Sequence, residues 1–439
     1  MTIRLPALTT GGMLLTTLLL FAASTAAQAS PPALTTLHTF AGPRGDGTSP
    51  LASVAIGSGG VLYGTTASGG SGSCINQFLP PGCGTVFSLT PPASPDGAWG
   101  EAVLYNFTGG SDGANPNAGV VIGSGGVLFG TTDSDGTAPG TSGYGTVFSL
   151  SPPASPGGAW TQTTLYSFTG GSDGANPYAP VAIGRDGALD GTTTGGGTSG
   201  AGTVFSLTPP ASPGGAWTET VLHNFTGGAG GRYPFGGLTI GANGVLFGTT
   251  LYGGTSFAGT VFALTPPASA GGAWRKHVLY NFLGPSLGDG YMPAGIVAGS
   301  GGVLYGITSA GGITGYPCGK AGCGTVFSLT PPASPGGAWT ESVLHAFAAF
   351  TDGYSPNAGM AIGIDGVLYG TTFGNRTVFA VTPPSPPGGS WTEAVLHTFT
   401  GGSDGGDPGG LAIDKRGVLL GTTYDGGTSN DGTVFALKP

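Results

Sequence analysis

A short string recurs seven times along this chain of 439 residues. Its form is GVLYGTT, and the first of its paired Thr positions falls at residues 65, 131, 192, 249, 307 (where Ile replaces it), 371 and 422. A second string, GTVFSL or a close variant, follows every copy and places a Phe at residues 87, 148, 205, 262, 327, 379 and 435. Such a regular recurrence is the signature of a repeat architecture, so one structural unit is built seven times.

Each unit predicts four short strands. Strand A is apolar on both faces, as in GVVIG, strand B reads VLYGTT, strand C reads GTVFSLTP, and strand D, as in WTETVLHNF, alternates more. A strand that is apolar on both faces must be buried on both, so strand A belongs inside and strand D lies nearer to solvent. Four-stranded units of this length predict the blades of a β-propeller, and a long-period solenoid is the alternative.

The two ends of the chain predict how the ring closes. The seventh unit stops at strand C, GTVFALKP, and the segment ALTTLHTF at 33–40 reads as a strand D that lacks the rest of its unit. We therefore predict an all-β, seven-bladed β-propeller with four antiparallel strands per blade, in which the N-terminal strand completes the last blade. The single propeller domain would span 30–439, with blades at about 50–107, 116–168, 177–225, 234–282, 293–347, 356–399, and 408–437 plus 34–40.

The repeated pattern DG-A-N-P…G-VLYGTT…GG…GTVFSLTP…LYNF resembles the GloVer-type tandem repeat of exported bacterial proteins with a choice of C-terminal anchors. The resemblance covers nearly all of 34–437. It implies export and association with the cell surface, and it transfers no reaction and no catalytic residue. Because the sequence ends without an anchor or sorting tail, we expect release or a periplasmic location.

Residues 1–29 read as a cleaved signal peptide. Arg4 precedes a short apolar run at 13–23, and AQAS at 27–30 supplies a cleavage site with small residues, while an uncleaved anchor is the alternative. Because Arg4 is the only charge there, 10 of the 11 basic and all 20 acidic residues remain, a balance that gives no electrostatic footprint for nucleic acid. We expect a secreted or periplasmic monomer with no membrane span after cleavage.

Two loops between strands B and C each carry a pair of cysteines. Cys74 and Cys83 bracket the first of these loops, and Cys318 and Cys323 bracket the fifth. In an exported chain, local pairs in the same loop position predict the disulfides Cys74–Cys83 and Cys318–Cys323. A zinc site with four cysteines would need the first and fifth blades to meet, which a closed ring prevents.

The repeats serve as an internal control for candidate catalytic residues. A residue type found at one position of most copies is expected to be architectural, which applies to the six Trp before strand D and to a position that holds either His or Tyr. The four Glu occupy one position of strand D, so we expect exposed strand residues there: Glu101, Glu219, Glu341 and Glu393. Few Glu and His are thus left for acid–base catalysis.

Six copies carry an Asp in the motif DGxxP. The Asp is expected to cap its own turn and the Gly to adopt a positive φ, with a cation-binding ring of carboxylates as the alternative. The string DSDG gives a better local metal candidate, in which Asp133 and Asp135 would bind calcium. No other cofactor is expected.

Antiparallel strand order places the D–A loops and the B–C loops on one face of the ring, called here the loop face. This face collects the loops of variable length, and variable loops on a rigid scaffold are where binding residues gather. Aromatic rings beside Asp and Asn suit sugars, although the same rings could pack the loops together. The candidate ligand-binding residues are Tyr144, Tyr178, Tyr233, Tyr252, Tyr291, Tyr316, Tyr354 and Tyr424.

Two functions remain open at this point. The main prediction is an exported, non-catalytic binding or scaffold module whose partner is a polysaccharide or a surface protein. The alternative is a glycan hydrolase or lyase that uses loop-face carboxylates. For the alternative, the loop-face Asp residues outside the repeated motif are available: Asp133, Asp135, Asp407, Asp425 and Asp431.

Overall fold

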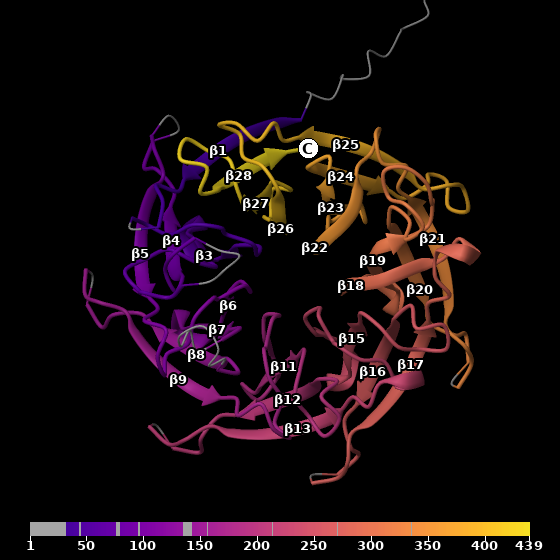
Figure 1. Ribbon diagram of the computed structural model, residues 1–439, viewed down its shortest axis with the longest axis horizontal. Helices are drawn as coiled ribbons and strands as arrows, with labels where there is room; N and C mark the ends of the chain where they lie inside the picture. Colours follow the sequence, from indigo (N-terminus) through magenta and orange to yellow (C-terminus); the bar gives the residue numbers. More distant parts are fainter. Residues whose placement is uncertain are drawn as a thin grey trace, which may run out of the picture. The chain divides into compact units, whose positions relative to one another are not determined.

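The computed structural model describes residues 32–439 apart from 44, 76–79, 95–96, 135–142, 156, 213, 270 and 335. In this part of the chain, seven antiparallel sheets of four strands stand around a central axis and form a seven-bladed β-propeller (Figure 1). The predicted fold class is confirmed. The predicted signal peptide at 1–29 lies outside the described residues.

The strands follow one order in every blade, with strand A innermost and strand D outermost. Blade 1 contains β2 (Ala55–Ile56), β3 (Leu62–Thr66), β4 (Thr85–Thr90) and β5 (Gly100–Asn106). Blade 2 contains β6 (Val121–Ile122), β7 (Leu128–Thr132), β8 (Thr146–Ser151) and β9 (Thr161–Ser167). Blade 3 contains β10 (Ala182–Ile183), β11 (Leu189–Thr193), β12 (Thr203–Thr208) and β13 (Thr218–Asn224).

The remaining blades keep this order. Blade 4 contains β14 (Thr239–Ile240), β15 (Leu246–Thr250), β16 (Thr260–Thr265) and β17 (Arg275–Asn281). Blade 5 contains β18 (Gly290–Ala298), β19 (Leu304–Gly311), β20 (Thr325–Thr330) and β21 (Thr340–Ala346). Blade 6 contains β22 (Tyr354–Ile362), β23 (Leu368–Gly374), β24 (Thr377–Thr382) and β25 (Thr392–Thr398). Blade 7 contains β26 (Pro408–Ile413), β27 (Leu419–Thr423), β28 (Thr433–Lys438) and β1 (Ala33–Thr39).

Short 3₁₀ turns connect some of these strands. Four lie between strands A and B: η1 (Ser58–Gly60), η2 (Ser124–Gly126), η4 (Ala242–Gly244) and η6 (Ser300–Gly302). Two lie in D–A loops: η3 (Gly228–Gly230) and η5 (Pro285–Leu287). The second residue of each A–B turn has a positive φ, which is why Gly or Asn stands there.

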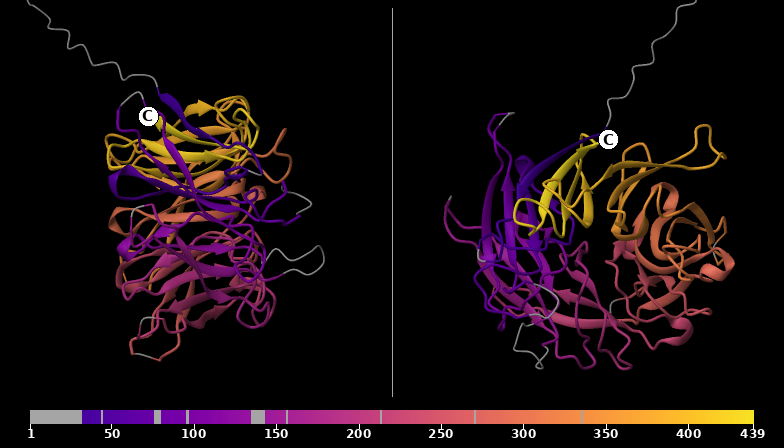
Figure 2. Two further views of the ribbon diagram at one scale, coloured as in Figure 1. Left: turned by 90° about the vertical axis from the view of Figure 1, so that its left-hand side faces the viewer. Right: turned by 45° about the horizontal axis from the view of Figure 1, so that its top comes forward.

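Strand β1 closes the ring as predicted. It pairs antiparallel with β28, from Ala33 opposite Lys438 to Thr39 opposite Thr433. Both ends of the described chain therefore lie in one sheet, which the two further views also show (Figure 2). Without β1, the outer edge of β28 would carry unpaired backbone groups.

A pair of Phe side chains packs at each junction between blades. The last Phe after strand D packs against the strand C Phe of the next blade at all seven junctions of the described ring, with ring centroids 5.0 to 5.3 Å apart; six pairs meet edge to face and the seventh is tilted. Phe40 and Phe87 make this contact where the ring closes, and both are fully buried. The Gly of strand B makes room for the second ring, since a Cβ at Gly64 would lie 2.5 Å from Cζ of Phe87.

The paired Thr residues hold strands and blades together. The hydroxyl groups of Thr66 and Thr85 lie 2.9 Å apart and connect strands B and C of blade 1. Thr65 donates a hydrogen bond of 2.8 Å to the carbonyl oxygen of Ala118 in blade 2. The strings GTT and GTVF therefore repeat because most of their side chains have a packing or hydrogen-bonding partner that also repeats. The first Thr position is the exception in blade 4, where the Thr249 hydroxyl has no partner among the described residues, and in blade 5, where Ile307 replaces it.

Blade 3 departs from the repeat at one buried position. In blade 1, Tyr63 of strand B packs edge-on against Trp160, with ring centroids 6.0 Å apart. In blade 3 the same position holds Asp190, which is only 7% exposed. Burial raises the pKa of Asp190, and a hydrogen bond with Ser206 opposes that effect. The structure gives no functional reason for this substitution.

Candidate functional site

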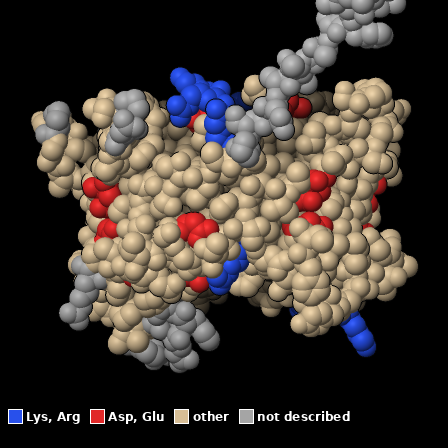
Figure 3. Space-filling model, turned by 90° about the horizontal axis from the view of Figure 1, so that it is seen from above, with Lys and Arg blue, Asp and Glu red and all other residues tan. Residues whose placement is uncertain are grey.

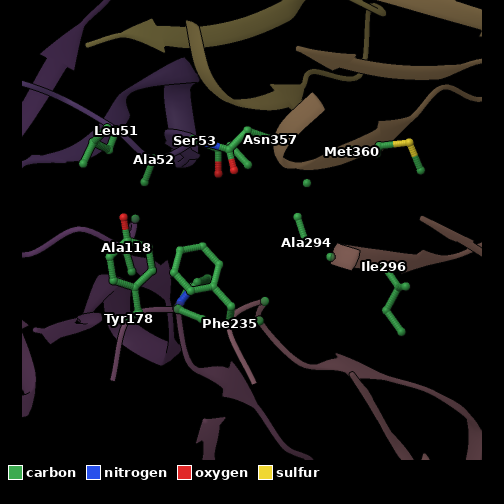
Figure 4. Close-up of a pocket in the computed structure, with 18 of the residues that line it drawn as sticks. Leu51, Ala52, Ser53, Ala118, Tyr178, Phe235, Ala294, Ile296, Asn357 and Met360 are labelled. Carbon is green, nitrogen blue, oxygen red and sulfur yellow. The ribbon is translucent and has the colours of Figure 1, made fainter. Parts of the chain in front are cut away.

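A cavity of about 290 Å³ lies at the centre of the ring, at the end where the inner strands begin. Because the D–A loops lead into these strands, the cavity opens toward the loop face. Its wall is formed by the residues that follow the repeated Pro of each D–A loop, and several of them point into the cavity in Figure 4. The first residues after that Pro, in blade order, are Leu51, Asn117, Tyr178, Phe235, Ala294 and Asn357.

The sequence analysis did not identify the residues after the repeated Pro as a candidate site, although their variation from blade to blade was visible in the sequence. The surrounding residues repeat from blade to blade, whereas the residue after the Pro changes from Leu to Asn, Tyr, Phe and Ala. A position that varies inside a fixed framework is free to serve a ligand.

Two aromatic rings form one side of the cavity. Tyr178 and Phe235 stack with centroids 4.3 Å apart and planes 26° apart (Figure 4). They come from consecutive blades, so the propeller rather than the local sequence brings them together. Stacked rings that border a cavity offer an apolar platform to a flat, apolar face of a ligand.

Asp133 is the carboxyl group associated with this platform. It follows β7 and lies beside Asn176, whose side-chain amide donates a hydrogen bond of 2.9 Å to the carbonyl oxygen of Asp133. Burial raises the pKa of Asp133 to about 6, and a side-chain hydrogen bond with Asn176 opposes that effect. Burial and the charge of Asp133 raise the pKa of Tyr178. An acid–base group and a cavity-lining phenol are therefore within electrostatic reach of each other.

The calcium hypothesis paired Asp133 with Asp135, and Asp135 lies outside the described residues. No set of three candidate metal ligands that includes Asp133 occurs in the described part of the chain.

The other predicted Tyr residues are distributed around the loop face. Of the eight candidate Tyr residues, Tyr178 lines the central cavity and the other seven do not. Tyr233, Tyr252 and Tyr291 form a separate cluster, with centroids 6.1 and 6.4 Å apart. The guanidinium of Arg232 lies 5.2 Å from the ring centroid of Tyr233 and 5.5 Å from that of Tyr252.

The remaining four Tyr also lie apart from the cavity. Tyr316 is 88% exposed beside Phe350 and borders an open hollow of the surface. Tyr354 packs against the core between blades 5 and 6. Tyr144 is 43% exposed, and the backbone N–H of Tyr424 donates to the carbonyl oxygen of Asp407.

Two loop-face carboxylates that the sequence left unassigned come together around an arginine. Arg376 Nε lies 2.6 Å from Asp407 Oδ1, and Arg376 Nη2 lies 3.6 Å from Asp425 Oδ2. The backbone N–H of Asp407 also donates to Asp425 Oδ1 at 2.7 Å. Burial and Asp425 raise the pKa of Asp407, whereas Arg376 opposes that effect. These mutually paired groups connect the loops of blades 6 and 7.

The Asp of the DGxxP motif caps its own turn, as predicted. Asp112 accepts hydrogen bonds from the N–H of Thr108 at 2.8 Å and from the hydroxyl of Thr108 at 2.6 Å. It also accepts a bond of 3.0 Å from the hydroxyl of Tyr105 in strand D. The sequence position that holds His or Tyr is thus the partner of this Asp, at the outer wall of the ring rather than at the mouth of the channel.

The strand D Glu residues are not exposed as the sequence analysis expected. Each lies against the Asp cap of the preceding blade, and its Oε1 atom is buried without a hydrogen-bond partner: Glu101, Glu219, Glu341 and Glu393. Burial and, to a smaller extent, Asp173 raise the pKa of Glu219 to about 7. Burial and Asp289 raise the pKa of Glu341 to about 7. Acidic side chains accordingly gather in separate patches on the outer wall (Figure 3).

We expect the protein to be more stable at pH 6 than at pH 8 because of Glu219 and Glu341. Their pKa in the folded state, about 7, exceeds the value of 4.5 expected for the unfolded chain, so folding takes up protons in this range. The contribution of these two Glu to the free energy of unfolding is therefore present at low pH and is lost as the pH rises through 7. After allowance for partial solvent screening, the two groups contribute about 1 kcal/mol between pH 8 and pH 6.

The measurement is the free energy of unfolding in urea at both pH values. The double variant E219Q/E341Q should remove that part of the difference. His223 changes stability in the opposite direction, since burial and Lys276 lower its pKa to about 4, but it is present in both proteins and cancels in the comparison. An unchanged pH dependence in the double variant would contradict the assignment.

Both predicted disulfides are present. Cys74 and Cys83 have Cα atoms 5.0 Å apart, and Cys318 and Cys323 have Cα atoms 5.1 Å apart. Disulfides persist in oxidising compartments outside the cytosol. Within the described residues, no helix is both long and apolar enough to span a bilayer.

Several solved structures share the fold. A protein from Lactobacillus plantarum is 14% identical, with a TM-score of 0.55 and coverage of 83% of this chain and 89% of the other. A putative 6-phosphogluconolactonase from Bacteroides uniformis is 15% identical, with a TM-score of 0.50 and coverage of 83% and 90%. A putative glucose dehydrogenase from Thermus thermophilus is 16% identical, with a TM-score of 0.46 and coverage of 74% and 96%. No match to a protein of curated function is found.

These comparisons correct the main functional prediction. A similar propeller with a TM-score of 0.50 is named as a putative 6-phosphogluconolactonase, which favours the alternative prediction over a non-catalytic binding or scaffold module. Identities near 15% establish the fold alone. The alternative prediction, an enzyme that uses loop-face carboxylates, agrees better with these neighbours.

The family is established by a different comparison. Residues 74–319, more than half of the chain, match the model described as the Gloeobacter/Verrucomicrobia repeat. This match agrees with the resemblance to GloVer-type repeats and with the seven blades of the fold. The chain belongs to the Gloeobacter/Verrucomicrobia repeat family.

Proposed function

We propose that the protein is a sugar-processing enzyme whose active site is the loop-face end of the central cavity. In this proposal Tyr178 and Phe235 bind the apolar face of a sugar ring, and Asp133 is the acid–base catalyst. The observation that carries it is the stacked pair of Tyr178 and Phe235 in the lining of the cavity, together with the charge of Asp133, which raises the pKa of Tyr178; Asp133 itself is not one of the lining residues.

The lining of the cavity favours an uncharged substrate. Among the described residues, the polar side chains that line it are neutral, and they include Ser53, Asn117, Thr239 and Asn357. Amide and hydroxyl groups match the hydroxyl groups of a sugar, whereas a phosphate would need cations. The substrate is therefore a neutral carbohydrate rather than a phosphorylated one.

One carboxyl group restricts the reaction that the site can perform. Cleavage of a glycosidic bond ordinarily needs two carboxyl groups on opposite sides of the sugar. Asp407 and Asp425 do not serve here, since both are engaged with Arg376 between blades 6 and 7. A single base suits the hydrolysis of a sugar lactone or ester, and lactone hydrolysis is the class of reaction for which the Bacteroides protein is named.

In this proposal Asp133 acts as the base and then as the acid of the chemical step. The carboxylate accepts a proton from a water molecule as that water attacks the carbonyl carbon, and the C–O bond to the leaving oxygen then breaks. The same carboxyl returns its proton to the departing alkoxide. A pKa near 6 leaves the carboxylate available as a base near neutral pH while keeping it basic enough to take up the proton.

The cellular location and the assembly state are part of the proposal. The predicted signal peptide and the two disulfides favour a secreted or periplasmic monomer, and the substrate would then be an extracellular carbohydrate. The disulfides restrain B–C loops of blades 1 and 5 on the loop face.

The test is a turnover assay with purified protein on three substrate groups: neutral aldonolactones, acylated neutral sugars and their phosphorylated counterparts. We expect hydrolysis of a neutral substrate at a rate at least about 10-fold above that of its phosphorylated analogue, after subtraction of spontaneous hydrolysis. Absence of turnover on every neutral substrate, or a preference for the phosphorylated ones, would overturn the proposal.

A further inference from the structure

Three potential metal ligands converge between blades 5 and 6, on the outer wall and away from the central cavity. His345 belongs to β21, Asp352 to the loop after β21, and Glu393 to β25 of the next blade. One ligand atom from each residue can be chosen so that all three lie within 4.8 Å of one another. His345 Nε2 lies 2.9 Å from Asp352 Oδ2.

One member of this group lacks a partner. Glu393 Oε1 is buried and accepts no hydrogen bond. Asp352, in contrast, accepts bonds of 2.9 and 3.1 Å from the backbone N–H of Ala348, so its position is fixed. Two carboxyl groups at one half-buried place are costly unless a proton or a cation lies between them. The same unpartnered Oε1 recurs at Glu219 and Glu341, where Tyr stands in place of His, so the imidazole of His345 is what adds a metal ligand at this junction.

The repeat supplies an independent observation at the junction between blades 3 and 4. There Gly230 stands in the D–A loop, where no Asp of the motif is present, and Lys276 occupies the position of Glu393. The ammonium group of Lys276 donates to the carbonyl oxygen of Gly230. It also lies 4.8 Å from the ring centroid of Phe225. Where the chain lacks the two carboxylates, it places its own cation at this location.

We propose that a divalent transition-metal ion binds between blades 5 and 6, with His345, Asp352 and Glu393 as its ligands. One imidazole nitrogen and two carboxylate oxygens suit zinc or manganese. Calcium and magnesium, in contrast, prefer ligand sets made of oxygen atoms alone. Bonds of about 2 Å would hold the ligand atoms a little over 3 Å apart, so the side chains need only small adjustments.

The ion would connect two outer strands that share no backbone hydrogen bonds. β21 and β25 belong to different sheets, so the ion adds a link between blades beyond the contact of Phe347 with Phe379. His345 is 21% exposed, which leaves an access path from solvent and a coordination position for water.

One other junction carries the same three residue types. His38, Asp46 and Glu101 occupy the equivalent positions where the ring closes between blades 7 and 1. In the described part of the chain, the ligand atoms of these three residues do not all lie within 4.8 Å of one another, as those of blades 5 and 6 do. Blades 5 and 6 therefore hold the better-formed site, and the experiment must separate the two places.

The experiment is titration calorimetry of chelator-treated protein with zinc chloride and with manganese chloride. The reference protein carries E101Q, which removes the carboxylate of the equivalent junction. All four cysteines are in disulfides, so thiolates cannot account for binding. Three substitutions are compared in this background: E393Q removes one charge at nearly constant size, H345Y copies the ligand set of the junction between blades 4 and 5, and E341Q is the matched control at that junction.

We expect the reference protein to bind one ion. E393Q and H345Y should weaken binding by at least about 100-fold, and E341Q should leave it unchanged. Absence of binding by the reference protein, or equal affinity after E393Q, would overturn the proposal.

Thermal unfolding gives a second readout. Zinc should raise the melting temperature of the reference protein and of the E341Q variant, and it should not do so after E393Q or H345Y. Each variant is compared with and without metal, so a loss of intrinsic stability does not obscure the result. An equal rise in all four proteins would contradict the assigned ligands. None of these results bears on the proposed function at the central cavity.

Discussion

Replacing Asp133 with asparagine should lower kcat on the best neutral substrate by about 10²- to 10⁴-fold, the usual contribution of general acid–base catalysis. The substitution keeps the size of the side chain and its position beside Asn176 but removes its ability to accept a proton. KM should change little because Tyr178 and Phe235 provide the platform. In the wild type, kcat should fall as the pH drops below about 6, since protonation removes the base.

Two variants make this result specific. Y178A should raise KM more than it lowers kcat, because it removes half of the stacked pair. D186N replaces an exposed Asp in the turn between β10 and β11, on the opposite face from the site, and should leave both constants unchanged. Asp133 is not the base if D133N keeps wild-type activity, or if the kcat of D133N still falls as the pH drops below about 6.

Removal of strand β1 should have the largest effect on stability. A protein that begins at residue 41 loses the pairing of β1 with β28 and the buried ring of Phe40. Truncating a buried Phe to Ala alone costs about 3 to 5 kcal/mol, so loss of the whole strand should cost more than about 5 kcal/mol. It also exposes the edge of β28, and we expect association of molecules through that edge.

Urea unfolding and size-exclusion chromatography measure these two effects. The matched control removes residues 1–31 and keeps β1, and its unfolding midpoint should equal that of the untruncated protein. A synthetic peptide of residues 32–43 should restore the midpoint of the shorter protein by adding the missing strand. A truncated protein that unfolds at the wild-type midpoint would show that the ring does not depend on closure by β1.

The predictions from sequence were most successful where a residue's partner repeats with it. The Phe of strand C and the paired Thr of strand B recur because the Phe contact and the Thr hydrogen bonds recur from junction to junction. The cysteine pairs were predictable for a related reason, since each pair lies within one loop. Such local, periodic features are visible in the order of the residues.

The same comparison of repeats misled us about Glu and about catalysis. Glu219 was expected to be exposed because the four Glu share one position of strand D, but the neighbouring blade covers it and places Asp173 beside it. Asp133 was considered mainly as a metal ligand because the sequence gives no hint that Tyr178 lies close to it. Both environments are made by residues of adjacent units, more than 40 positions apart in the chain.

The sequence by itself determined the number of blades, the order of strands and the closure of the ring, because hydrophobic periodicity and turn residues act over a few positions. Only the tertiary structure decided which side chains meet at the centre and at the junctions. Closing seven units into a ring brings the residues after each repeated Pro around one axis, and it buries carboxyl groups of one blade against those of the next. Those contacts depend on the curvature of the whole ring, which no single repeat contains.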